Sequence, residues 1–163
     1  MPISNLRKQR EQLARQGLEI LIRNKCITFT PPFTVYTSGK IGPDKVDCGK
    51  ILKTPGDQYH AATLLHFLYQ STERIAPPPT TLITGGETID WIYSNRVAEL
   101  AHLPASMLYK NGGVRGAELK DQVITHIADV NSAGSSVPQR WLPIITREGG
   151  TLKQVVFFVE RNE

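Results

Sequence analysis

An aspartate followed by small polar residues is the part of this sequence best suited to bind a ligand. The segment ITHIADVNSAGSSV, residues 124–137, runs from apolar residues through Asp129 into a string of Asn, Ser, Ala and Gly. A carboxylate at Asp129 could accept hydrogen bonds from two vicinal hydroxyls of a sugar, and the backbone N–H groups and hydroxyls that follow could surround a phosphate. A polar turn after a strand has the same local pattern, so the segment alone leaves both interpretations open.

Two other segments combine groups that could contact an anion. Gly85 and Gly86 follow the apolar run TLIT, where their backbone amides could face a phosphate, although a tight strand-to-helix turn is the simpler explanation. The segment TSGK, residues 37–40, brings hydroxyls and an ammonium together on a flexible backbone. A solvated turn would look much the same, and the residue types favour neither reading.

Several well-defined sites are excluded by spacing. The dinucleotide fingerprint G-x-G-x-x-G, the phosphate-loop lysine motif, HExxH and CxxC are all absent from the sequence. The four histidines are dispersed, and His126 lies within an apolar run that favours a structural role. The sequence therefore predicts no metal site built directly from side chains.

The composition is that of an ordinary globular protein, with 40% hydrophobic and 21% charged residues in 163. We expect one domain over residues 1–163 and no membrane span, because the chain lacks a long apolar run. The two cysteines are too few for a disulfide framework, which with the polar start of the chain favours the cytoplasm. The net charge of +4 is scattered, and the basic residues near Arg7 alternate with Glu11, so the pattern argues against a nucleic-acid surface.

Apolar periodicity predicts an α/β fold. Helices are expected at residues 5–23, 56–74, 89–100 and 136–148, and strands at 81–84, 105–109, 122–130 and 153–160. Short strands and turns are expected within 26–52, broken at Pro31-Pro32 and Gly42-Pro43, and a glycine-rich loop at 110–116. Apolar strands that alternate with helices imply a mostly parallel sheet covered on both faces, so the loops after Thr84, Tyr109 and Asp129 should meet at one site.

Four segments in this order resemble one family. PFTVYTSGKIGPDKVDCGKILKTP is similar to its N-terminal signature, ITGGETIDWIYSNRVAELAHLP to its pyrophosphate loop and helix, VITHIADVNSAGSSV to its phosphoribosyl-diphosphate motif, and GGTLKQVVFFVERNE to its last core strand. The family is that of the orotate phosphoribosyltransferases, within the type I phosphoribosyltransferase fold. The resemblance runs from about residue 17 to 162.

The resemblance implies a central sheet flanked by helices, a small N-terminal hood, and a cytoplasmic homodimer. It implies transfer of a phosphoribosyl group from phosphoribosyl diphosphate to orotate, giving orotidine 5′-monophosphate in pyrimidine biosynthesis, with Mg²⁺ bound through the diphosphate. Asp129, Lys40 and Lys110 would take part in catalysis. The ribose and its phosphate would be bound by Asp129, Asn131, Ser132, Ala133, Gly134, Ser135 and Ser136. The pyrophosphate loop would be Gly85, Gly86, Glu87 and Thr88, and the base pocket would include Thr37, Ser38, Gly39 and Lys40.

The sequence departs from the family pattern at several of these places. Ala128 replaces the first of two acids before the phosphate loop, and Asp90 and Trp91 replace glycine and a small residue after the pyrophosphate loop. Lys45 and Val46 replace an aromatic pair. The segment that resembles the family's mobile loop is shorter, with Lys110 and Arg115 as its remaining candidate cations.

These departures leave three functions open. The first is an orotate phosphoribosyltransferase of weak or impaired activity. The second is a catalytically inactive paralogue that binds a phosphorylated nucleotide or sugar, or a protein partner, in a regulatory role. The third is an enzyme of the same fold that acts on another base.

Overall fold

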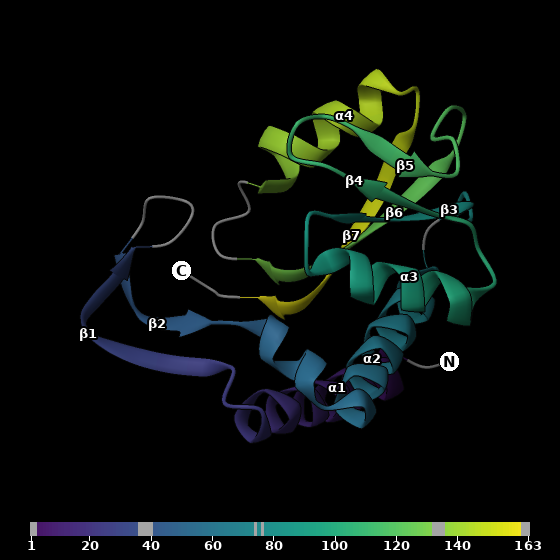
Figure 1. Ribbon diagram of the computed structural model, residues 1–163. Coiled ribbons are helices and arrows are strands. Elements are labelled where there is room, and N and C mark those ends of the chain that lie inside the picture. Colours follow the sequence, from purple (N-terminus) through teal and green to yellow (C-terminus); the bar gives the residue numbers. More distant parts are fainter. Residues whose placement is uncertain (1–2, 36–40, 74, 76, 132–135, 161–163) are drawn as a thin grey trace.

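Five strands form one twisted sheet between two layers of helix in the computed structural model of the chain, which describes residues 3–35, 41–73, 75, 77–131 and 136–160 (Figure 1). The helices are α1 (Ile3–Arg23), α2 (Pro55–Glu73), α3 (Asp90–Ala101) and α4 (Leu142–Arg147), with a 3₁₀ segment η1 (Cys48–Lys53) and a π-helical turn η2 (Val137–Trp141). The strands are β1 (Ile27–Val35), β2 (Ile41–Val46), β3 (Leu82–Gly86), β4 (Ala105–Leu108), β5 (Val114–Gly116), β6 (Val123–Asn131) and β7 (Thr151–Glu160).

The sheet has the strand order β5-β4-β3-β6-β7, and β3 pairs in parallel with both β4 and β6. β6 and β7 are also parallel, whereas β5 is antiparallel to β4. Every residue of β3 is buried, as is the stretch 124–128 of β6. Continuous burial is what a parallel strand covered on both faces requires, and the predicted α/β architecture is confirmed.

Two separate clusters of apolar side chains cover the faces of the sheet. Ile83 and Ile127 belong to a large cluster with residues of α1, α2 and α3. Leu82 and Ile124, which lie one and three positions earlier on the same two strands, pack with Trp141 and the apolar residues of α4. The clusters lie on opposite sides because successive side chains of a strand point to opposite faces.

Two expected elements in the second half of the chain take a different form in the structure. The expected glycine-rich loop at 110–116 contains the short edge strand β5, which is only three residues long and has no apolar alternation to reveal it. The expected helix at 136–148 is divided into η2 and α4, each with a proline at one of its first positions. Proline lacks the N–H that an α-helix interior requires, and it is tolerated in the first turn.

Strands β1 and β2 form an antiparallel ribbon that projects from the sheet and corresponds to the expected hood (Figure 1). The strands are longer than the sequence suggested, because β1 continues through Pro31-Pro32. The register shifts between Phe29 and Thr34, around the two prolines. A ribbon of two strands tolerates this because its prolines can occupy positions that do not pair.

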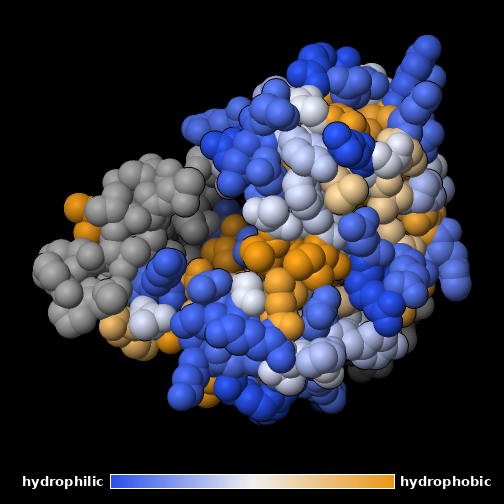
Figure 2. Space-filling view, in the orientation of Figure 1, coloured by the Kyte–Doolittle hydropathy of each residue, from blue (hydrophilic) through white to orange (hydrophobic). Residues whose placement is uncertain are grey.

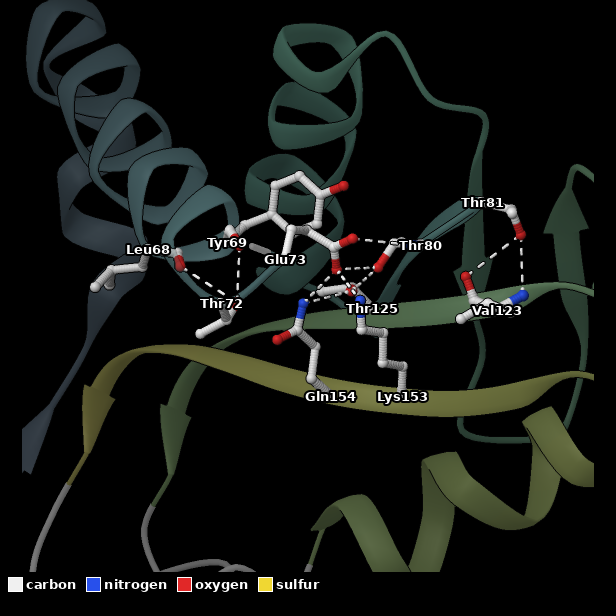
Figure 3. Close-up of polar contacts among 10 residues, drawn as sticks. All are labelled: Leu68, Tyr69, Thr72, Glu73, Thr80, Thr81, Val123, Thr125, Lys153 and Gln154. Atoms are coloured by element: carbon white, nitrogen blue, oxygen red, sulfur yellow. Dashed lines mark hydrogen bonds and ion pairs between the residues drawn. The ribbon is translucent and has the colours of Figure 1, made fainter. Parts of the chain in front are cut away.

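The amino end of the sheet is held to α2 by one carboxylate (Figure 3). Glu73, the last residue of α2, accepts hydrogen bonds at Oε1 from Lys153 Nζ (2.7 Å) and Gln154 Nε2 (2.9 Å), and at Oε2 from the backbone N–H of Thr80 (2.9 Å). The Thr80 hydroxyl lies 2.5 Å from Glu73 Oε1 and 2.7 Å from the hydroxyl of Thr125. This network joins α2 to β6, to β7 and to the segment that leads into β3.

Candidate functional site

The carboxyl ends of β3, β4 and β6 lie together at one edge of the sheet, as the parallel order predicts. The backbone N–H of Lys110, just after β4, donates to Glu87 Oε2 just after β3 at 2.9 Å. The backbone N–H of Asp129, near the end of β6, donates to Asp90 Oδ1 at the start of α3 at 2.8 Å. In Figure 1 the arrowheads of β6 and β7 point toward the β1–β2 ribbon, and α3 begins beside them.

The site is bordered by an apolar surface. Figure 2 shows hydrophobic side chains gathered near the first turn of α3, in the middle of the face that also carries the β1–β2 ribbon. Ile89, just before α3, together with Val46 of β2 and Val130 of β6, is partly buried and packs against the large core cluster. The edge of the sheet therefore combines carboxyl groups with an apolar border.

Eight of the predicted binding residues belong to segments outside the described part of the chain. These are Thr37, Ser38, Gly39 and Lys40 between β1 and β2, and Ser132, Ala133, Gly134 and Ser135 between β6 and η2. Their predicted roles stay predictions.

The described residues of the predicted ribose and phosphate site lie at the end of β6 and the start of η2. Asp129 Oδ1 accepts a hydrogen bond from the backbone N–H of Val130 at 2.6 Å. Asn131 ends β6, and its side-chain amide lies 3.5 Å from Glu160 Oε1 on β7. Ser136 is exposed immediately before η2, and its side chain does not cap that helix. Asp129 is thus the described carboxylate that leads into the serine-rich segment.

Packing accounts for both glycines of the predicted pyrophosphate loop. They are the last two residues of β3, so the loop begins at Glu87, where the Glu87–Thr88 peptide is cis. A Cβ on Gly85 would overlap Ser94 Oγ and lie 2.8 Å from the backbone oxygen of Asp90. A Cβ on Gly86 would overlap the Trp141 ring on the other face of the sheet. Neither glycine needs an anion to explain it.

Aromatic side chains fill the space between α3 and the β4–β5 hairpin. The Trp91 ring lies 4.6 Å from that of Tyr109, and its Nε1 donates to the backbone oxygen of Leu108 at 3.2 Å. The guanidinium carbon of Arg115 lies 5.9 Å from the Tyr109 ring centroid. Trp91 therefore lies beside the predicted pyrophosphate loop, and Arg115 stacks at the outer end of the aromatic group.

The segment that resembles the family's mobile loop is a tight hairpin here. The backbone N–H of Tyr109 donates to Gly113 O and that of Gly112 donates to Tyr109 O, both at 2.9 Å. Gly112 has a φ of +88°, a conformation that favours glycine. The Arg147 guanidinium of α4 donates to the backbone oxygen of Gly112 and thereby fixes the tip of the hairpin. Lys110 is an exposed residue of this turn.

Solved structures of phosphoribosyltransferases share this architecture, whereas no protein-family profile and no curated protein sequence matches the chain. A UMP synthase of Leishmania donovani superposes with a TM-score of 0.73 and 17% identity over 91% of this chain. An orotate phosphoribosyltransferase of Aeropyrum pernix gives a TM-score of 0.72 and 18% identity over 93% of this chain and 83% of its own. An adenine phosphoribosyltransferase of Thermoanaerobacter pseudethanolicus gives 0.63 and 16% over 88% of this chain and 87% of its own.

This chain has the type I phosphoribosyltransferase fold. The chain spans only 31% of the length of the UMP synthase. Because proteins that act on orotate and proteins that act on adenine both share the fold, the likeness leaves the choice of base open.

In this fold the site carries an excess of negative charge. Burial raises the pKa of Asp129 above its ordinary value, although hydrogen bonds from Asp90 and from the Val130 amide partly offset that effect. Burial and the negative charge of Asp129 raise the pKa of Asp90 well above its usual range. Asp47, just after β2, is a third carboxyl group, and its negative charge raises the pKa of Asp129 further.

Three residues that the sequence did not mark as functional shape the site. Asp90, noted only as a departure, lies against Asp129. Trp141 of η2 covers Gly86. The guanidinium carbon of Arg140 lies 5.8 Å from the centroid of the Trp141 ring, so η2, which follows the serine-rich segment, carries a cation. Arg140 could have been found from the sequence, because a basic residue stands a few positions after the serine-rich segment. The roles of Asp90 and Trp141 could not, because their contacts are with residues far away in the sequence.

Among the described helices, none is long and apolar enough to cross a membrane.

Proposed function

We propose that this protein is a phosphoribosyltransferase of the orotate type with low turnover. The observation that carries the proposal is the position of Asp129. On a phosphoribosyltransferase fold, this carboxylate lies at the end of β6, directly before a serine- and glycine-containing segment and beside the loop after β3. Ligands of parallel α/β sheets bind at this edge.

Each part of the site has a role in this proposal. Asp129 would accept hydrogen bonds from the ribose hydroxyls, and residues 132–136 would surround the 5′-phosphate. Lys110 and Arg140 are the nearby cations for the phosphate groups, and Lys40 would approach the base. Their work is positioning and electrostatic stabilisation of a leaving pyrophosphate, with no covalent step on the protein.

The residues present fit a magnesium ion that arrives with its ligand. Among the described residues, no group of three His, Cys, Asp or Glu side chains could hold a metal ion. Mg²⁺ commonly keeps its waters and is held through substrate phosphates. Bound to the diphosphate, it would neutralise charge on the leaving group.

Orotate is proposed as the base because the sequence resemblance is to orotate enzymes, and similar solved structures include an orotate phosphoribosyltransferase of Francisella tularensis. Low turnover is proposed because Ala128 lacks a carboxyl, Trp91 fills space beside the loop after β3, and the β4–β5 hairpin is short and tied down by Arg147. A missing hydrogen bond to a charged group corresponds to about 1.5–3 kcal/mol, or roughly 10- to 100-fold in binding.

The acidity of the site favours one second candidate, a non-catalytic protein that binds a ribose phosphate or nucleotide in a regulatory role. Among the described residues, no lysine or arginine forms an ion pair with Asp90 or Asp129. A diphosphate would bind poorly in such a field, while a ligand with one phosphate and a free ribose would meet less repulsion.

Orotate consumption separates the two candidates. The protein is incubated with Mg²⁺, phosphoribosyl diphosphate and orotate, and orotate absorbance is followed, with adenine in a parallel assay and Asp129→Asn as the control. Slow loss of orotate that Asp129→Asn abolishes is the expected result. No consumption of either base at high protein concentration would contradict the proposed activity.

A thermal-shift assay then tests for binding without turnover. Ribose 5-phosphate, orotidine 5′-monophosphate and phosphoribosyl diphosphate are compared, because a ligand at 100 times its Kd stabilises the folded state by about 2.7 kcal/mol. Stabilisation without consumption of base supports the second candidate. We also propose a homodimer, which light scattering after size exclusion would show as twice the chain mass.

A further inference from the structure

The side chain of Asp90 lies against Asp129 at the carboxyl end of β6. Asp90 Oδ1 accepts the backbone N–H of Asp129 at 2.8 Å, and the two side chains also lie within hydrogen-bonding reach of each other. Asp90 is only 8% exposed. A hydrogen bond between two carboxyl groups requires a proton on one of them, so two carboxyl groups placed in this way can share one proton.

The surroundings show which carboxyl keeps this proton. Asp90 is the more deeply buried, and the negative charge of Asp129 opposes its ionisation. Asp129 accepts the backbone N–H of Val130 as well as the bond from Asp90, and both contacts favour its ionised form. Asp90 is therefore the hydrogen-bond donor and Asp129 the carboxylate that accepts.

Within the described part of the chain, the groups that face the pair do not neutralise it by other means. Asp47, just after β2, is itself acidic and raises the pKa of Asp129. The Cys48 thiol of η1 stays neutral because burial raises its pKa. Tyr93 of α3 is also neutral, since burial raises the pKa of its hydroxyl, which donates to Cys48 O at 3.1 Å. The Gly86 amide of β3 also donates a hydrogen bond to Asp90, and this bond favours the ionised form of Asp90. Burial and the charge of Asp129 have the larger, opposite effect.

Asp129 has no second acid beside it on its own strand, and a carboxyl group from another element lies next to it instead. Ala128 is 6% exposed, and its small side chain leaves Asp129 without a neighbouring acid on β6. Asp90 brings a carboxyl to Asp129 from α3, 39 positions away in the sequence.

We propose that Asp90 is a positioning residue that donates the shared proton to Asp129 and so fixes the orientation and charge of the carboxylate presented to a ribose diol. This role rests on the proposed function. The proton keeps the net charge of the pair at one negative unit, which limits repulsion of an anionic ligand. Loss of the proton would add a charge and remove the donor that orients Asp129.

The test compares Asp90→Asn and Asp90→Ala with the unaltered protein. Asparagine can donate a hydrogen bond to Asp129 but does not titrate, whereas alanine removes the donor. Binding of phosphoribosyl diphosphate with Mg²⁺ is measured by calorimetry from pH 5 to pH 9. Since each protein meets the same ligand, ionisation of the ligand cancels in the comparison.

We expect the unaltered protein to lose affinity as pH rises and the pair loses its proton. Asp90→Asn should lack this loss, and Asp90→Ala should bind roughly tenfold more weakly at neutral pH. A purely structural role for Asp90 would leave the pH profile of Asp90→Asn equal to that of the unaltered protein. That equality would overturn the proposal.

Carbon-13 NMR of the aspartate carboxyls in the ligand-free protein separates failure of this proposal from failure of the proposed function. One carboxyl should titrate well above the ordinary aspartate range, and Asp90→Asn should remove it. In Asp90→Ala the Asp129 pKa should rise, because a donor that favours its ionised form is lost. Ordinary titration of both carboxyls would overturn the shared proton whatever the protein binds. A shared proton in a protein that binds none of the ribose phosphates would instead refute the proposed function and, with it, the role of Asp90 toward ribose.

Discussion

The two ends of the central sheet handle buried charge in opposite ways. At the amino end, Glu73 is matched by Lys153, whose side chain is only 8% exposed, and the surrounding hydroxyl and amide groups complete the network (Figure 3). At the carboxyl end, Asp90 and Asp129 are paired with each other, with Asp47 nearby. One end is balanced in charge and the other is not.

The difference shows in the pKa values. Burial alone would raise the pKa of Glu73, but the hydrogen bonds from Lys153 and Thr80 more than offset it, and the pKa lies below its ordinary value. The same burial raises the pKa of both Asp90 and Asp129. Groups that serve only stability are expected to have compensating partners, and uncompensated charge at the edge where ligands bind is expected of a functional site.

The largest expected effect comes from breaking the balanced end. Glu73→Ala leaves the Lys153 ammonium buried without a carboxylate, and we expect the free energy of unfolding to fall by about 3–5 kcal/mol in urea denaturation. Glu87→Ala is the matched change at the other end. Glu87 accepts a hydrogen bond from the Lys110 amide and is partly exposed, so a loss of about 1 kcal/mol or less is expected. Equal losses would remove the contrast between the two ends.

A smaller effect is expected for a change at the carboxyl end that disturbs packing without altering charge. Gly86→Ala would force the Trp141 ring to move, at a cost of about 1–3 kcal/mol in the free energy of unfolding. Adding Trp141→Leu should recover part of the loss, as a double-mutant cycle would show. A Gly86→Ala protein of unchanged stability that binds ligand less well would instead indicate that the glycine serves the approach of an anion.

His126 offers a test by pH. Its Nδ1 lies 3.0 Å from the Thr84 hydroxyl, while Nε2 has no partner among the described residues, and burial lowers the pKa to about 3. The unfolded chain takes up a proton below about pH 6.5 and the folded chain does not, so stability falls as pH falls through this window.

We expect His126 to account for a loss of about 2 kcal/mol in the free energy of unfolding between pH 7 and pH 5. His126→Gln should remove this share of the pH dependence. His102→Asn, at an exposed position with a φ of 55° that asparagine tolerates, should retain it. An unchanged pH dependence in His126→Gln would show that the imidazole is protonated in the folded state.

The smallest change in stability, and the sharpest contrast with Glu73, is expected for Asp129→Asn. Asparagine keeps an oxygen that can accept the bond from Asp90 and removes a buried charge, so the free energy of unfolding should change by less than about 1 kcal/mol or should increase. Binding of ribose 5-phosphate should fall by roughly 10- to 100-fold in calorimetry. Strong destabilisation would show that Asp129, like Glu73, is chiefly structural.

Much of the fold follows from patterns that are local in the sequence. The apolar runs at 81–84 and 122–130 predicted the central strands β3 and β6, because a strand buried on both faces must be apolar throughout. The short strand β5 was missed because it is an exposed edge strand with no apolar signal of its own. The division of the last helix followed from Pro138 and Pro143, whose presence was visible but whose effect on geometry was not.

The sequence by itself determined which residues stand at the ends of the parallel strands. Apolar strands that alternate with helices along the chain place Asp129 and Glu87 at the carboxyl end of the sheet. Tertiary structure alone decided what those residues meet. The contact of Asp90 with Asp129 joins positions 39 apart, and Gly85 and Gly86 are constrained by α3 and η2 from opposite faces. Periodicity records whether a side chain is buried, whereas its partner, and therefore its charge, depends on how distant elements pack.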